Sequence, residues 1–208
     1  MKTKIIKKSG FTLVETLVTI AIFSILMTGI TLMIRNIFMV SEQQHGILSN
    51  TNQATIISSN FVNELRNATY GANGAYPINQ ATNNQLIFYS TTPKKNGTVS
   101  QIRYYLTGNT LYKGITNPAG SPPSYNGQPE TITTLNTQMS MGSNSLFSYY
   151  DGTYSGNGNA LTQPVNINVI RFIKINLTVL TDAVRNGTGT FTVTSGASLR
   201  NLKTNLGN

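Results

Sequence analysis

Few side chains in this sequence are of the types that catalyse reactions or bind metals. His45 is the only histidine and there is no cysteine, so a Ser/His/Asp triad or a zinc site would have to use His45. The sequence contains no Gly-x-Ser-x-Gly elbow and no phosphate-cradling loop. We therefore interpret His45 as a surface residue and predict no enzyme activity and no cofactor.

The acidic residues are also too few and too scattered to indicate catalysis. A glycosidase uses a pair of carboxylates, which here would have to be Glu130 with Asp151 or Asp182, and no other feature supports such a pair. The six acidic residues are Glu15, Glu42, Glu64, Glu130, Asp151 and Asp182.

One segment has oxygen-bearing side chains at alternate positions, as a calcium-binding loop does. These are Asp151, Thr153, Ser155 and Asn157, but Thr162 stands where an EF-hand loop needs a bidentate glutamate. Asp151 is thus the single candidate metal ligand, and an ordinary turn is the alternative interpretation.

Glu15 is unusual because it is the only charge in an apolar run of 24 residues, Phe11 to Ile34. A carboxylate at the centre of a membrane helix costs about 2.5–3.5 kcal/mol, and less toward the membrane edge. Glu15 is therefore either hydrated at headgroup depth or paired with a cation.

The apolar run is long enough to be a membrane helix. At 1.5 Å per residue it spans about 36 Å, against about 30 Å for a hydrocarbon core. Four lysines precede Gly10, which predicts a cytoplasmic N-terminus and an extracytoplasmic C-terminal part. A secretory signal has its small-residue cleavage site after the apolar region, whereas Gly10 comes before it, so cleavage there would leave the helix in the product.

The segment Lys7-Lys8-Ser9-Gly10-Phe11-Thr12-Leu13-Val14-Glu15 resembles the class III leader of type IV pilins and type II secretion pseudopilins. The shared pattern is a short basic leader ending in Gly, then Phe-Thr-Leu-x-Glu opening an apolar helix. The resemblance implies that a prepilin peptidase cuts between Gly10 and Phe11 and methylates the new amine of Phe11. It also implies that Glu15 meets the N-terminal amine of a neighbouring subunit, which offsets the cost of burying either charge alone.

Beyond residue 35 the pattern becomes amphipathic. Apolar residues recur at multiples of three or four, and there is no proline between Phe11 and Tyr76, so one helix is expected from about 11 to about 68. The expected segments are a leader (1–10), a transmembrane and filament-core helix (11–34), its amphipathic continuation (35–68) and an extracytoplasmic β-rich domain (69–208). The amphipathic stripe comprises Ile47, Ala54, Ile57, Phe61 and Leu65.

The C-terminal part reads as strands separated by turns. Gly108-Asn109 predicts a hairpin, and the proline-rich stretch 114–129 predicts an exposed loop. A break in alternation at Ile170-Arg171-Phe172 predicts a bulge or bend. The fold expected is α+β and pilin-like, with the long helix on an antiparallel sheet. The expected strands are 86–90, 102–107, 111–112, 146–150, 165–180 and 191–193.

Further stretches resemble J-type minor pseudopilins, the tip-complex subunits of type II secretion, which have relatives in pilus and competence systems. They are residues 104–112, the Phe147 to Asp151 stretch, the alternating strand 173–179 and Arg200-Asn201. The resemblance implies a minor subunit of a tip or initiation complex. Its partners would be the prepilin peptidase, other major and minor pilins or pseudopilins, an inner-membrane assembly platform and membrane lipid. The chain would cross the cytoplasmic membrane once and later enter the filament.

Charge leaves one alternative function open. Only 10 % of the residues are charged, against about 25 % in an average soluble protein. Residues 35–208 nevertheless carry eleven basic and five acidic side chains, a net +6 that would suit a DNA-binding minor pilin of a competence system. The basic residues, such as Lys94, Lys95, Arg103 and Lys113, are scattered, so a solvated surface is the preferred interpretation. A membrane-anchored surface enzyme with this leader would lack evident catalytic groups.

Overall fold

The computed structural model describes residues 10, 12–92, 97–140, 142, 144–181 and 189–199, without the side chains of 42–47. The chain divides into two compact units, residues 1–45 and 46–208. Several residues singled out above lie outside the described ones: Phe11, Lys94, Lys95, Asp182, Arg200, Asn201 and the side chains of Glu42, His45 and Ile47.

Helix α1 runs over Leu13–Arg66. Its segment Leu13–Ser41 has a mean hydropathy of 2.4 and is long and apolar enough to cross a membrane. Within it, the hydroxyls of Ser24, Thr28 and Thr31 each donate a hydrogen bond of 2.8–2.9 Å to the carbonyl four residues earlier. These polar groups are thus satisfied inside the helix, as an apolar surrounding requires.

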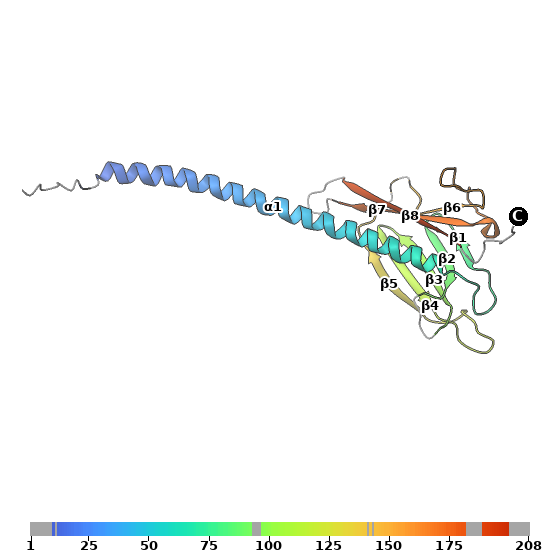
Figure 1. Ribbon diagram of the computed structural model, residues 1–208. Helices are drawn as coiled ribbons and strands as arrows, with labels where there is room; N and C mark the ends of the chain where they lie inside the picture. The colour runs from blue at the N-terminus through green and yellow to red at the C-terminus, as the bar shows by residue number, and fades with distance from the viewer. Residues whose placement is uncertain are drawn as a thin grey trace, which may run out of the picture. The chain divides into compact units, whose positions relative to one another are not determined.

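The strands form two antiparallel sheets (Figure 1). The first has the order β1-β2-β3-β4-β5 and the second β6-β7-β8. The first contains β1 (Ile78–Ala81), β2 (Gln85–Ser90), β3 (Ser100–Thr107), β4 (Thr110–Thr116) and β5 (Glu130–Asn136). The second contains β6 (Phe147–Tyr150), β7 (Phe172–Leu180) and β8 (Thr190–Ser198), and the short 3-10 helix η1 is Ile167–Val169.

The α+β architecture is confirmed, with four corrections. The strands belong to two sheets instead of one, and β1 and β5 are strands that the sequence pattern does not predict. The predicted loop 114–129 is wrong at its start, because β4 continues to Thr116. The predicted strand 165–180 begins only at Phe172, because the 3-10 helix η1 precedes it. Asn166 caps η1 by accepting a hydrogen bond from the Asn168 N–H. The hairpin at Gly108-Asn109 is confirmed by the pairing of Thr107 with Thr110.

The amphipathic stripe of α1 enters a core shared by both sheets. Phe61 is fully buried, and its ring lies 5.3 Å from Tyr104 on β3, 6.3 Å from Phe88 on β2 and 5.7 Å from Phe147 on β6, between centroids. Leu65 is equally buried. Aromatic pairs at these separations add about 0.5–1.5 kcal/mol each beyond the burial of their area.

A buried polar contact also links α1 to the first sheet. The Tyr104 hydroxyl donates a 2.7 Å hydrogen bond to Glu64 Oε2, and Lys113 Nζ pairs with Glu64 Oε1. Glu64 is only 5 % exposed. Burial raises the pKa of Glu64, while the hydrogen bond and charge of Lys113 and the Tyr104 hydroxyl oppose that rise. The interpretation of Lys113 as a solvated surface charge is therefore wrong.

Removal of the Tyr104 hydroxyl should destabilise the protein in a pH-dependent way. A carboxyl with a raised folded pKa stabilises the fold below its unfolded pKa, and this contribution is lost as pH rises through the folded pKa. Because the hydroxyl favours the ionised form, Tyr104→Phe should raise the pKa of Glu64 further. We expect it to lower the free energy of unfolding by about 1.5–3 kcal/mol at pH 7 and by less at pH 4.

The measurement is urea unfolding of the full chain in detergent, followed by tyrosine circular dichroism at both pH values. Tyr105→Phe is the matched control, because Tyr105 is the next residue on β3 but lies half-exposed and stacked on Tyr112. It should change stability by less than about 0.5 kcal/mol. Equal losses for Tyr104→Phe at pH 4 and pH 7 would contradict this account of Glu64.

Candidate processing and assembly site

Helix α1 begins with a reciprocal pair of side chain to backbone hydrogen bonds. Thr12 Oγ1 accepts from the Glu15 N–H at 3.3 Å, and Glu15 Oε2 accepts from the Thr12 N–H at 3.4 Å. The Thr12 hydroxyl also donates to Glu15 Oε2 at 3.4 Å. This is a capping box, which satisfies two of the amide donors that a helix N-terminus leaves without partners inside the helix.

The capping box shows that Glu15 caps the helix. The sequence analysis considered only the charge of Glu15 and did not predict this role. The sequence signal is the spacing Thr12-x-x-Glu15, which is the pattern of a capping box. The carboxylate lies in the first turn of α1, where the helix dipole favours negative charge. It reaches back to the amide of Thr12, the residue that follows Phe11. The Glu15 carboxylate is therefore held at the N-terminal end of α1.

Gly10, the predicted cleavage residue, precedes the helix and is exposed. A Cβ added to it would meet no other atom within 4 Å, so a larger side chain fits there in the free subunit. An effect of substitution at Gly10 would consequently report on a binding enzyme rather than on folding.

The N-terminal part of α1 presents apolar side chains on all sides. The large apolar residues from Leu13 to Val40 that face outward are between 38 and 78 % exposed. An apolar surface of this extent requires lipid or other apolar helices around it. Glu15 is the only ionisable side chain in the described part of this surface before Arg35.

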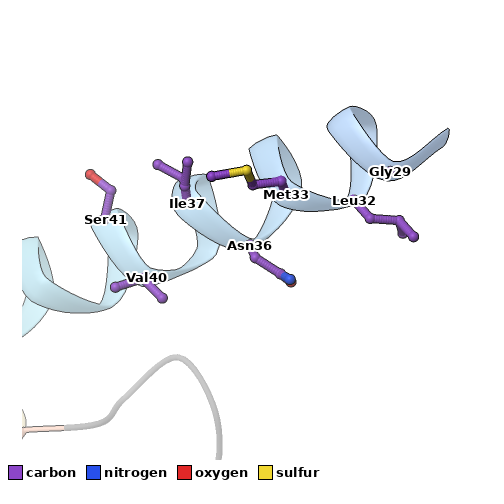
Figure 2. A pocket seen from close by; sticks show the side chains of 7 residues that line it. All are labelled: Gly29, Leu32, Met33, Asn36, Ile37, Val40 and Ser41. Carbon is purple, nitrogen blue, oxygen red and sulfur yellow. The ribbon is translucent and has the colours of Figure 1, made fainter. Parts of the chain in front are cut away.

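A shallow hollow lies along this surface near Gly29 (Figure 2). Figure 2 shows Met33 and Ile37 at one edge of the helix and Leu32, Asn36 and Val40 at the other. Gly29 contributes no side chain, and an added Cβ would have no neighbour within 4 Å. All lining residues come from α1, so the hollow offers a place for another apolar helix to approach closely.

The other candidate residues form hydrogen bonds or ion pairs with neighbouring side chains. Asp151 Oδ1 accepts from the Thr153 hydroxyl at 2.6 Å and from its N–H at 3.0 Å, and these bonds lower the pKa of Asp151. Glu130 forms a bidentate ion pair with Arg103, whose Nε donates at 2.8 Å. Within the described residues no group of three or more His, Cys, Asp or Glu side chains is placed to hold a metal ion.

Comparison with known proteins places the recognisable signal at the N-terminus. Residues 6–31 match the prokaryotic N-terminal methylation motif. No curated protein matches the chain. The matched segment contains Gly10, the capping box and the first part of the apolar helix. The match covers only the start of the chain and overlaps the helix that is long and apolar enough to cross a membrane.

Proposed function

We propose that this chain is a minor pilin or pseudopilin subunit that is cut between Gly10 and Phe11, methylated on the amine of Phe11 and assembled into a filament through α1. The observation that carries the proposal is the methylation-motif match over residues 6–31, which coincides with a capped apolar helix whose surface is unburied. Before assembly the apolar segment would cross the cytoplasmic membrane once, with the β-rich unit outside. The filament would be a type IV pilus or a type II secretion pseudopilus.

Glu15 would act at the moment of assembly. In the single subunit its carboxylate is held by Thr12 at the helix end. In a filament core without water, an ammonium on the first residue of a neighbouring subunit would offset the cost of burying this charge. Such a pair would also set the register between packed helices, as a buried polar contact does in coiled coils.

The unit 46–208 would contact other minor subunits in a tip or initiation complex. The sequence resemblance to J-type minor pseudopilins supports this position. A DNA-binding role in a competence system is the alternative. Two of the basic side chains that could bind phosphates, Arg103 and Lys113, are instead paired with glutamates.

Processing can be tested directly in cells that have an active prepilin peptidase. Wild-type protein purified from the membrane should begin with N-methylated Phe11, and Gly10→Val should keep its leader, as judged by intact mass and N-terminal sequencing. Gly29→Ala is the matched control, because it changes a glycine in the same segment with equal free space and away from the predicted cut. An uncut wild-type chain would overturn the proposed function.

The role of Glu15 can be separated from its capping contact. Glu15→Gln keeps an oxygen that can accept from the Thr12 N–H but removes the charge. We expect this variant to be cut like wild type and to enter filaments at least about tenfold less, since each 1.4 kcal/mol of a lost ion pair is a factor of ten. The measurement is quantitative immunoblotting of sheared filaments and membranes.

Thr12→Ser is the control for the capping box, because serine keeps the hydroxyl that caps the helix. It should assemble normally. If Glu15→Gln assembles as well as Thr12→Ser, the proposed pairing of Glu15 is wrong, although the predicted cleavage would stand.

A further inference from the structure

The outward face of the second sheet carries an aromatic cluster apart from the main core. Tyr150 on β6 and Phe172 on β7 lie 6.1 Å apart between ring centroids, and Tyr154 from the following loop lies 4.0 Å from Tyr150 and 5.1 Å from Phe172. None of the three belongs to the core that α1 enters. The loop 151–161 is thus folded onto this face by its own aromatic contact.

A cavity of about 160 Å³ lies under this loop. At about 30 Å³ per water molecule it has room for about five waters, so it suits one small ring rather than a large ligand. Its lining combines aromatic rings with a carboxylate, a hydroxyl and two amides. These side chains are Tyr150, Tyr154, Asp151, Thr153, Asn157 and Asn159.

The cavity is held in shape by hydrogen bonds and packing. The Tyr154 hydroxyl donates to the Gly156 carbonyl at 2.6 Å, and the Leu161 N–H donates to the Tyr149 carbonyl at 2.8 Å. On β8, a Cβ at Gly196 would lie 2.7 Å from the Phe172 ring, so this glycine leaves the space that the ring fills. A site organised before binding loses little entropy when a ligand is ordered in it.

A row of polar side chains continues from the cavity along the same face. Ser148 on β6 pairs with Lys174 on β7, two residues beyond Phe172. Asn176 Nδ2 then donates to the Ser148 hydroxyl at 3.2 Å, and its Oδ1 accepts from the Thr194 hydroxyl at 3.1 Å. These cross-strand bonds fix hydroxyl and amide groups in a flat array that extends from the cavity.

Asp151 is the charged residue that lines the cavity, and two basic residues lie near it: Lys174, and Arg171, whose Cγ would be 3.7 Å from a Cβ at Gly152. The Lys174 ammonium lies 5.0 Å from the ring centroids of both Tyr150 and Tyr154, and the Asp151 carboxylate lines the cavity itself. Sites for single-stranded nucleic acid combine exposed rings with a positively charged groove that follows the phosphates. A carboxylate in the cavity opposes phosphate, so a neutral ligand is favoured.

We propose that the cavity under loop 151–161 and the adjoining face of β6-β7-β8 bind a neutral oligosaccharide. A sugar ring presents an apolar C–H face that packs on aromatic rings, and hydroxyls around its edge that both donate and accept hydrogen bonds. Tyr154, which is partly exposed and packs on the buried Tyr150, supplies the ring, and Asp151, Asn157 and Asn159 supply the partners for the hydroxyls. Further sugars of the chain would follow the row of Ser148, Asn176 and Thr194. The proposal does not depend on filament assembly.

The test is calorimetric titration of the full chain in a detergent without a sugar headgroup. The probes are cellohexaose, chitohexaose and maltohexaose, with a single-stranded DNA oligomer as the other ligand class. We expect at least one hexasaccharide to bind with a dissociation constant below about 1 mM. Saturable binding of none of the three sugars, or binding of the DNA alone, would overturn the proposal.

Substitutions in the cavity test whether the sugar binds there. Tyr154→Leu should weaken binding at least tenfold, whereas Tyr70→Leu, at an exposed tyrosine outside the site, should not change it. The double variant Asn157→Ala/Asn159→Ala changes only exposed side chains, so it tests the site even where Tyr154→Leu disturbs folding. It should weaken binding about fivefold or more, with Asn60→Ala on the exposed side of α1 as its control. Sugar binding that survives both cavity variants would place the ligand elsewhere and overturn the proposal.

Discussion

The fold of residues 46–208 depends on the contact between Phe61 and aromatic rings of two separate sheets. In the described residues the two sheets share no strand ladder. Backbone contacts such as the Met139–Val179 bridge and the bond from the Phe147 N–H to the Asn83 carbonyl join them, and the side chains of α1 pack both into one core. Phe61 does this most directly, because its ring contacts Tyr104 and Phe88 on the first sheet and Phe147 on the second. The amphipathic part of α1 is therefore the centre of the unit rather than a cover on one sheet.

The same helix carries two glutamates in apolar surroundings, and the chain accommodates them differently. Glu64 is satisfied permanently within its own unit by Tyr104 and Lys113. Among the described residues the Glu15 carboxylate has the capping contact with Thr12, and Glu15 is exposed. A buried carboxylate needs a cation or several donors. Glu64 already has them, whereas Glu15 would need a cation if its surroundings became apolar, and this supports the proposed role of Glu15 in assembly.

Sequence reasoning succeeded where a pattern is local and failed where the partner is distant. The apolar run, the stripe Ala54, Ile57, Phe61 and Leu65 and the Gly108-Asn109 hairpin are local patterns, and the structure confirms them. The pairing of Glu64 with Lys113 joins residues 49 positions apart, so periodicity could not reveal it. Strand β5 was missed because its apolar residues, Ile132 and Leu135, stand three positions apart and do not alternate, and because it lies at the sheet edge with most side chains exposed. The capping box was readable from the spacing Thr12-x-x-Glu15.

The low content of charged residues can also be related to how the polar side chains are paired in the structure. Two of the basic side chains in the β-rich unit, Arg103 and Lys113, are neutralised by glutamates, and the outer face of β6-β7-β8 is ordered by hydroxyl and amide bonds instead of ion pairs. Interactions between exposed charges are screened by salt over about 8–10 Å, whereas neutral hydrogen bonds are affected far less. A surface ordered in this way should change little with ionic strength, which agrees with the neutral, hydroxyl-rich ligand that we propose for it.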